Sequence, residues 1–231
     1  MSLDEEFCDS PYQFMKTHVV RVVLSNQFQK PITNEVTAFV VESPYAPAID
    51  NAPRPNSKVC HLHLVEDPGA PPAPKYTRKV YWCHYDKNDS HSTILGRKHA
   101  YMFTPQMDGC SFGAGALSSD GAATVVHSNA VDFGSQHLND VNGVVGALKM
   151  QAHKQTEMLD QTFSQANKSL GRIISPFSYM SENGGIEFRM KATIFGRRNT
   201  DNQWKFYSHV YRTLGMKYIH CGVNKYARTL T

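Results

Sequence analysis

The sequence predicts one α+β domain in which two β-sheets pack together with helix on the outside. Three observations support this fold class. Segments rich in β-branched and aromatic residues fill the first half of the chain, a long stretch with helical periodicity follows at about 136–170, and strand-like segments return after it. This order differs from the regular β-α alternation of a parallel doubly wound sheet, and it favours an α+β architecture.

The strands predicted in the first half are short and are separated by turn-forming segments. Two Pro-rich stretches, 43–57 and 66–76, read as loops within the domain because proline does not fit regular structure there. We see no composition shift that marks a domain boundary, so 1–231 is treated as a single domain. The predicted strands are "THVVRVVL" (17–24), "EVTAFVVE" (35–42), "KVCHLHLV" (58–65), "RKVYWCHY" (78–85) and "HAYMFT" (99–104).

One long helix is predicted at about 136–170. Ser135 is the expected N-cap and Gly171 the expected residue after its C-terminus. The apolar stripe turns polar near Gln155, so a break is expected there. After the helix, "GIEFRMKATIFG" and "QWKFYSHVYRTL" flank "RRNTDN", which predicts a hairpin. The stripe comprises Leu138, Val141, Val145, Leu148, Ala152, Leu159, Phe163, Ala166 and Leu170.

Composition excludes several classes of protein. The net charge is only +4, and no block of like charges indicates binding to nucleic acid or to a membrane surface. No apolar run approaches the roughly 18 residues of a membrane span. The acidic start, "MSLDEEFCDS", has no signal-peptide core, so Sec export is not expected. The five cysteines are scattered without a CxxC pair, which indicates reduced thiols. We expect the protein to be a monomer.

The stretch "TPQMDGCSFGAG" (104–115) carries the candidate chemistry. Asp108-Gly109 suits a tight turn that presents Cys110, and "CSFGAG" and "AATVVHS" read as a hairpin. If the turn centres on Ser118-Ser119, Cys110 and His127 oppose each other directly, with Cβ atoms about 5 Å apart. If Asp120-Gly121 is the turn instead, the register shifts and the contact is less direct.

A cysteine nucleophile sets chemical requirements that this stretch can meet. The attacking species is the thiolate, so Cys110 needs a base, and His127 is the candidate. The base needs an orienting group, for which we expect the hydroxyl or the backbone carbonyl of Thr104. The oxyanion formed on attack needs nearby donors, for which we expect backbone N–H groups around the turn at Gly109 and Ser111.

The segment "FTPQMDGCSFGAG…DGAATVVHSNA" resembles the catalytic segment of the cytotoxic necrotizing factor family of glutamine deamidases, in particular the Burkholderia lethal factor branch. Its "T-x-x-x-x-G-C" segment matches Thr104 to Cys110, the "FAG"-like piece matches 112–115, and the histidine matches His127. Asp108 stands where the toxin motif has serine. The chemoreceptor deamidases of bacterial chemotaxis have a similar Thr-Cys-His order. The resemblance covers about 30 of the 231 residues.

The resemblance implies a sandwich of two mixed β-sheets flanked by helices, and an activity that converts a protein glutamine to glutamate through a thioester on Cys110. It implies a eukaryotic host substrate, such as a small GTPase or a translation factor, and delivery to the host cytosol by a route other than Sec. A chemoreceptor-type deamidase and a transglutaminase remain alternatives, because they share the acyl-enzyme. A non-catalytic β-sandwich binding module is a further alternative, and it predicts a buried, inert Cys110.

We expect neither a metal nor an organic cofactor. In "CHLHL" (60–64), His61 and His63 share one face of a predicted strand, but the sequence shows no third or fourth ligand beside them. We therefore interpret both as solvent-facing histidines. No phosphate-binding loop motif is present in the sequence.

Overall fold

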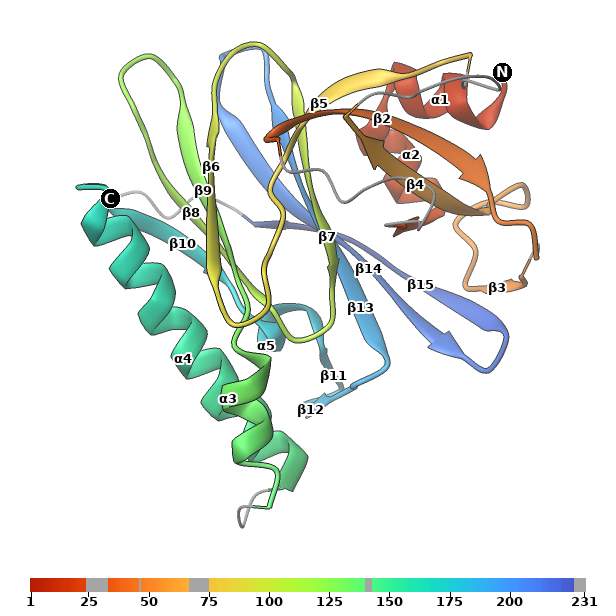
Figure 1. The fold of residues 1–231 in the computed structure, drawn as a ribbon. Helices are drawn as coiled ribbons and strands as arrows, with labels where there is room; N and C mark the ends of the chain where they lie inside the picture. The colour runs from red at the N-terminus through yellow and green to blue at the C-terminus, as the bar shows by residue number, and fades with distance from the viewer. Residues whose placement is uncertain (24–32, 46, 67–74, 140–142, 227–231) are drawn as a thin grey trace.

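The computed structural model describes residues 1–23, 33–45, 47–66, 75–139 and 143–226. Within these residues the chain forms a four-layered α+β sandwich, which confirms the predicted fold class (Figure 1). Two short helices cover one face of a large sheet, a smaller sheet packs on its other face, and one long helix covers the smaller sheet. Val141 and most of the second Pro-rich loop lie outside the described residues.

The large sheet is mixed. Its strands lie in the order β1-β4-β2-β5-β7-β13-β14-β15-β3. The pairs β1–β4, β5–β7 and β15–β3 are parallel, and the other neighbours are antiparallel. The bounds are β1 Val19–Val22, β2 Glu35–Glu42, β3 Ile49–Asp50, β4 Val59–Val65, β5 Arg78–Trp82, β7 Tyr101–Met107, β13 Met190–Arg198, β14 Trp204–Leu214 and β15 Lys217–Tyr226.

The smaller sheet has the order β10-β8-β9-β6, and all its pairs are antiparallel, so only one of the two sheets is mixed. Its strands are β6 Ser90–Leu95, β8 Ser111–Leu117, β9 Ala123–Ser128 and β10 Leu170–Ile174. A further two-stranded ribbon is formed by β11 (Ser181–Glu182) and β12 (Gly185–Ile186). The strands predicted before and after the helical stretch are thus observed, with β13 and β14 forming the predicted hairpin.

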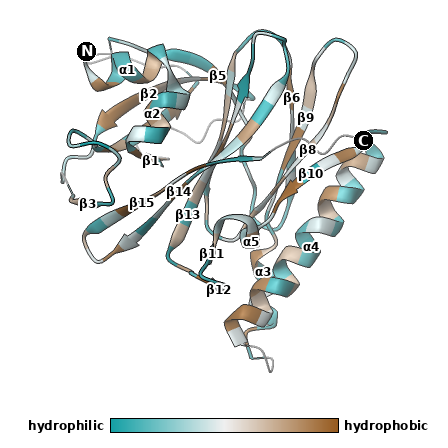
Figure 2. Ribbon diagram, turned by 180° about the vertical axis from the view of Figure 1, so that it is seen from behind, coloured by the Kyte–Doolittle hydropathy of each residue, from teal (hydrophilic) through white to brown (hydrophobic). Residues whose placement is uncertain are grey.

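The helices occupy the two outer layers. α1 (Leu3–Asp9) and α2 (Pro11–Thr17) bury Phe7 and Phe14 against the large sheet. α3 (Val131–Gln136) and α4 (Gly143–Gln165) lie beside each other at the opposite side, and α5 (Pro176–Tyr179) follows β10. In Figure 2, α4 carries both hydrophobic and hydrophilic residues, as expected for a helix with one face on a sheet and the other in solvent.

The long helix is shorter than predicted, and its ends differ. Ser135 lies inside α3 rather than at an N-cap, and Gly171 lies inside β10. A helical stripe cannot reveal these ends, because α3 and β10 continue the apolar pattern on either side. The expected break near Gln155 is absent: α4 runs continuously through it, and the Gln155 side chain is fully buried. The polar position in the stripe therefore marks a buried contact and not a helix end.

Alternating residues of the small sheet divide between two cores. Phe112 and Val125 face the large sheet, whereas Val126 packs against Leu159 and Phe163 of α4. This division follows from the two-residue period of a strand. It fixes which side of β8 and β9 any functional side chain occupies.

The β8–β9 register lies between the two predicted alternatives. Ser111 pairs with Ser128 and Phe112 with His127, so Cys110 comes opposite Asn129 rather than His127. Ser118 N–H donates to the Ala122 carbonyl at 2.9 Å, which closes a three-residue loop with Gly121 at φ 80°. An irregularity between Ala114 and Leu117 then shifts the pairing by one residue.

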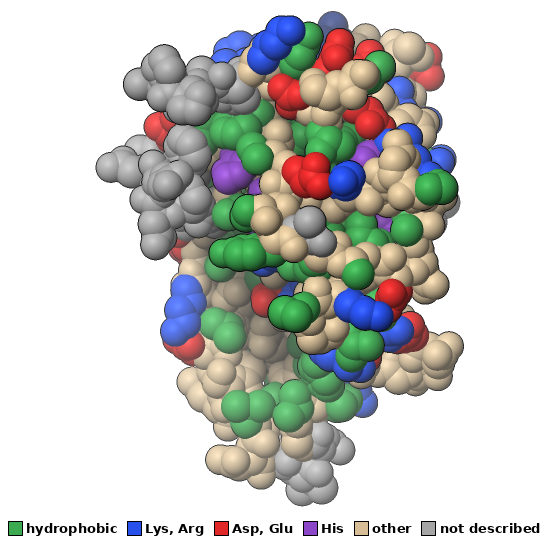
Figure 3. Space-filling view, turned by 90° about the vertical axis from the view of Figure 1, so that its right-hand side faces the viewer, with side chains coloured by type: hydrophobic (Ala, Val, Ile, Leu, Met, Phe, Trp, Pro, Cys, Tyr) green, Lys and Arg blue, Asp and Glu red, His purple; other side chains and the backbone are tan. Residues whose placement is uncertain are grey.

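The face of the molecule in Figure 3 carries acidic and basic side chains interspersed with hydrophobic ones. Ion pairs on the surface join neighbouring strands, such as Lys58 with Glu42 at 2.9 Å. Such a mixed surface agrees with the small net charge of the chain.

Removing a buried side chain from α4 tests the outer layer of the sandwich. Leu159 is fully buried against Val126 and Phe163. Leu159→Ala should lower the free energy of unfolding by about 2–5 kcal/mol, because it deletes buried methyl groups and leaves a cavity. The control Val144→Ala, at a side chain 55% exposed on the same helix, should change it by less than about 0.5 kcal/mol. If urea denaturation showed the same loss of unfolding free energy in both variants, the burial of this face of α4 would be contradicted.

Candidate functional site

Cys110 lies on a tight turn between β7 and β8. Gly109, just before it, has φ 139°, a backbone conformation that residues with a Cβ rarely adopt. A Cβ at this position would also lie 3.2 Å from Nε2 of Gln151. The predicted turn is therefore present, and glycine is required for it.

Side chains from α4 hold the turn by its carbonyl group. Nε2 of Gln151 and Nε2 of Gln155 each donate a hydrogen bond to the Gly109 carbonyl, both at 2.9 Å. Gln155 also accepts a bond from the Ser111 hydroxyl at 2.7 Å. One buried glutamine thus ties together the residues on both sides of Cys110, which explains the polar position in the helical stripe.

Tyr179 of α5 holds the same turn from another direction. Its hydroxyl accepts a hydrogen bond from the Gly109 N–H at 3.0 Å and donates one to the Cys110 carbonyl at 2.9 Å. Burial raises the pKa of this phenol well above its ordinary value, so the hydroxyl keeps the proton that it donates. The backbone of Cys110 is therefore fixed by side chains of two helices.

Cys110 is 3% exposed and packs in the core between the sheets. Nδ2 of Asn129 donates a hydrogen bond to Sγ at 3.2 Å. Oδ1 of Asn129 accepts bonds from the backbone N–H groups of Asn88 (3.3 Å) and Val131 (3.1 Å), which orients the amide with its NH₂ group towards the sulfur. Burial raises the pKa of the thiol to about 11, and the Asn129 hydrogen bond opposes this rise.

His127 lies on the same face of the small sheet as Cys110, two residues before Asn129. It pairs with Phe112 on β8 and with His91 on β6, and it is fully buried. Its position relative to Cys110 is diagonal, and diagonal neighbours lie about 7–8 Å apart, within reach of longer side chains. The ring of Tyr85 lies 5.2 Å from the imidazole. Cys110 and His127 thus share one face of the small sheet, although they do not face each other directly.

Thr104 occupies a β-bulge in the large sheet. Phe103 pairs with Phe195 and Gln106 with Thr193, so Thr104 and Pro105 together stand opposite Ile194. Proline has no N–H, and the threonine hydroxyl replaces the missing ladder contacts: it accepts from Ile194 N–H at 3.2 Å and lies within hydrogen-bonding distance of the Pro105 and Ile194 carbonyls. Its hydrogen bonds to described residues join it to backbone, so the orienting role towards His127 stays a prediction.

One predicted oxyanion donor has a partner in this structure: the Gly109 N–H donates to Tyr179. The Ser111 side chain points towards α4, on the side of β8 away from the sulfur. A role for Gly109 in binding an oxyanion would require exchange of the tyrosine for the substrate oxygen. The roles of Gly109 and Ser111 in catalysis therefore also stay predictions.

Four residues of this site were missed by sequence reasoning: Asn129, Gln151, Gln155 and Tyr179. The spacing His127-Ser128-Asn129 carried a usable signal, because alternate residues of a strand share one face. Gln155 was visible as a polar residue in an apolar stripe. Tyr179 carried no local signal, since its contact depends on the return of the chain through β10 and α5.

Among the residues that the structure describes, no third metal ligand gathers with His61 and His63. The rings of His61 and His63 are 6.4 Å apart, and His63 stacks on Phe39 at 5.0 Å. Both histidines are partly buried rather than solvent-facing, and burial lowers the pKa of each imidazole.

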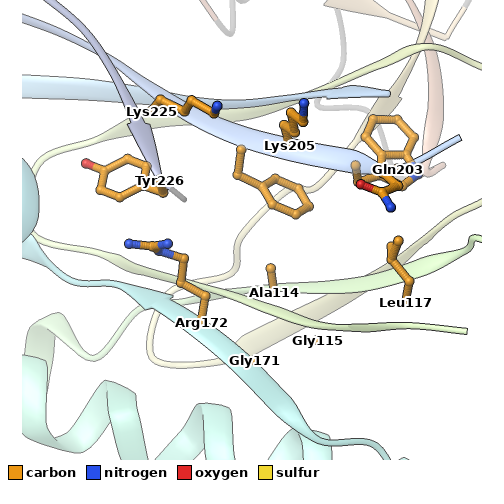
Figure 4. A pocket seen from close by; sticks show the side chains of 11 residues that line it. Ala114, Gly115, Leu117, Gly171, Arg172, Gln203, Lys205, Lys225 and Tyr226 are labelled. Atoms are coloured by element: carbon orange, nitrogen blue, oxygen red, sulfur yellow. The ribbon is translucent and has the colours of Figure 1, made fainter. Parts of the chain in front are cut away.

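A separate cavity opens between the two sheets at the other end of β8 (Figure 4). Tyr226 of the large sheet faces Arg172 of the small sheet across it, and Phe206 and Ala114 also line it. The Arg172 guanidinium lies 5.2 Å from the centre of the Tyr226 ring. Neither Cys110 nor His127 lines this cavity, so it is distinct from the thiol site.

No protein-family model matches the chain, and no curated protein matches it. Among the residues that the structure describes, no helix is long and apolar enough to cross a membrane.

Substituting Gln155 tests the clamp on the turn. Gln155→Leu keeps the approximate volume but removes the bonds to Gly109 and Ser111, so it should lower the free energy of unfolding by about 1–3 kcal/mol. Gln161→Leu, at an exposed position of the same helix, is the matched control and should have little effect. Thermal or urea unfolding measures both variants, and an unchanged Gln155→Leu would show that the clamp contributes nothing.

The raised thiol pKa predicts how Cys110 reacts with iodoacetamide. Since the thiolate is the reactive form and the pKa is about 11, the alkylation rate should climb about tenfold per pH unit between about pH 7 and pH 10 without levelling off. In urea-unfolded protein the same cysteine should level off near its ordinary pKa of about 8.5. Peptide mapping by mass spectrometry follows the site, and a plateau below about pH 8 in the native protein would contradict the described environment of the sulfur.

Proposed function

We propose that the protein is a cysteine-dependent amidohydrolase that converts a glutamine side chain of a protein substrate to glutamate. The observation that carries the proposal is the arrangement around Cys110: a turn fixed by three side chains, an amide donor 3.2 Å from the sulfur, and His127 on the same face of the sheet. The α+β sandwich and the toxin-like segment around Thr104 and Cys110 support it.

In this mechanism Cys110 is the nucleophile. His127 accepts the thiol proton, and Sγ attacks the amide carbon of glutamine to give a tetrahedral intermediate. Its C–N bond breaks as His127 returns the proton to the leaving ammonia, which leaves a thioester. Water then attacks the thioester, His127 takes its proton, and glutamate is released with the thiol restored. The sum is amide plus water to carboxylate plus ammonium.

Asn129 has a defined task in this scheme. Its NH₂ group donates to the sulfur, and a donor to sulfur stabilises the thiolate relative to the thiol. The resting Cys110 is 3% exposed, so substrate binding must displace neighbouring side chains before attack. Fixing the backbone at Gly109 keeps the nucleophile in position during that opening.

The proposal extends to the substrate through the resemblance. A toxin-type enzyme acts on a host protein such as a small GTPase or a translation factor, in the host cytosol, after delivery by a route other than Sec. A chemoreceptor-type deamidase has the same chemistry with a bacterial substrate. A transglutaminase differs only in that a primary amine replaces water at the thioester.

A second candidate function is a non-catalytic binding module. The observation that favours it is the same sulfur: burial leaves Cys110 3% exposed and raises its pKa to about 11. In that case the glutamine and tyrosine contacts serve only to stabilise the sandwich.

Incubation with a eukaryotic lysate separates these functions. The wild-type protein should convert a specific glutamine to glutamate, and mass spectrometry of the lysate should show it. Cys110→Ser should abolish conversion, since a hydroxyl does not supply the thiolate, and His127→Ala should reduce it by about 10²–10⁴-fold. Asn129→Leu should reduce it less.

Cys8→Ser is the matched control, because it removes a thiol of α1 that packs against a different core cluster from Cys110, and it should keep full activity. Added primary amine that appears on the glutamine would identify a transglutaminase, and receptor fragments as the substrate would identify the chemoreceptor type. Conversion that persists in a folded Cys110→Ser protein would reject the mechanism.

A further inference from the structure

A cluster of metal-binding side chains lies beside the proposed active site. His84 and Asp86 follow β5, and His91 is the second residue of β6. One ligand atom from each of the three lies within 4.8 Å of the others. Sequence reasoning missed this set, because His84 and His91 are seven residues apart and only the turn between β5 and β6 brings them together.

We propose that His84, Asp86 and His91 form a binding site for a divalent transition metal of the Zn²⁺ type. Two imidazoles and one carboxylate are a ligand set that zinc accepts, with a fourth position left for water or another donor. This proposal concerns a site distinct from the thiol chemistry and does not depend on it.

The distance between His84 and Asp86 suits such an ion. With zinc bonds of about 2.0–2.1 Å, tetrahedral ligand atoms lie about 3.3 Å apart. Nε2 of His84 and Oδ2 of Asp86 are already 3.6 Å apart. The two imidazole rings have centroids 3.3 Å apart, closer than the roughly 5 Å of two imidazoles on one tetrahedral zinc, so binding requires the two rings to move apart.

A neighbouring residue supports the orientation of one ligand. Oδ1 of Asn34 lies 3.2 Å from Nε2 of His91 and can accept its proton, a contact that would fix the tautomer and the orientation of the ring. The backbone of Asn34 is itself held in place, because its main-chain carbonyl accepts a hydrogen bond from the Trp82 N–H at 2.9 Å. Metal-bound imidazoles in proteins ordinarily have an acceptor of this kind.

The three proposed ligands differ in their exposure to solvent, which gives an ion access to the site. His84 is 8% exposed and His91 is partly buried, whereas the Asp86 side chain is 55% exposed. A cation can therefore meet the carboxylate at the surface and then bind the imidazoles. His91 of β6 pairs directly with His127 of β9, so a bound ion would lie near the histidine of the proposed active site.

Zn²⁺ binding to the tag-free, full-length chain tests the proposal. Calorimetry should show one ion per chain, and Co²⁺ should give visible absorption bands of a site with nitrogen and oxygen ligands. Asp86→Asn and His91→Gln should each weaken binding by at least about 10–100-fold, the loss known for residues that merely support metal ligands. The melting temperature should rise with Zn²⁺ in the wild type and not in these variants.

His153→Ala is the matched control. His153 faces Glu157 at 3.3 Å on α4, a histidine–carboxylate pair without a third ligand among the described residues, and its loss should leave binding unchanged. Asp86→Asn changes an exposed side chain and is expected to fold, so it decides the test if the His91 variant unfolds. Absence of saturable binding at one ion per chain, or wild-type affinity in Asp86→Asn, would overturn the proposal. Because these readouts need no substrate, failure of the deamidase proposal would not affect them.

Discussion

The carbonyl group of Gly109 is the constraint on which the rest of the site depends. It lies in the interior between β8 and α4, where an unbonded carbonyl would be costly, and two glutamine side chains bond to it. These bonds fix α4 against the small sheet at the point where the chain turns into Cys110. Tyr179 adds a third contact from α5, so the outer helix layer and the thiol position are determined together.

The site combines a fixed backbone with a thiol that is protonated, and therefore unreactive, in the absence of substrate. A neutral thiol is tolerated in an apolar core, whereas a thiolate is not, which is why burial raises the Cys110 pKa to about 11. Activity as a nucleophile then requires groups that stabilise the anion once substrate arrives. Asn129 at the sulfur and His127 along the same face are the candidates that the structure offers for this task.

Most of the fold was predictable because it rests on local patterns. β-Branched and aromatic segments identified the strands, and the 3.6-residue stripe identified α4 although not its ends. The turn at Gly109 and Cys110 was also predicted from composition. The β8–β9 register was not, because it depends on a three-residue loop and a bulge near Ala114, and a one-residue change decides which side chain faces Cys110.

The roles of individual polar residues depended on contacts that are distant in sequence. Thr104 was predicted to orient His127, a role that stays a prediction, while the structure shows that the Thr104-Pro105 bulge engages its hydroxyl with Ile194, about 90 positions along the chain. The buried Gln155 looked like a helix break. In both cases the residue type gave the capacity to form hydrogen bonds, and only the packing of distant elements chose the partner.

Covalent labelling by a glutamine analogue tests the central claim most directly. A peptide in which a diazoketone replaces the glutamine amide should form one adduct per chain, located on Cys110 by peptide mapping, and the adduct should be strongly reduced in His127→Ala. Labelling that is instead spread over the more exposed thiols Cys8 and Cys221, with Cys110 unmodified, would contradict a nucleophilic role for Cys110.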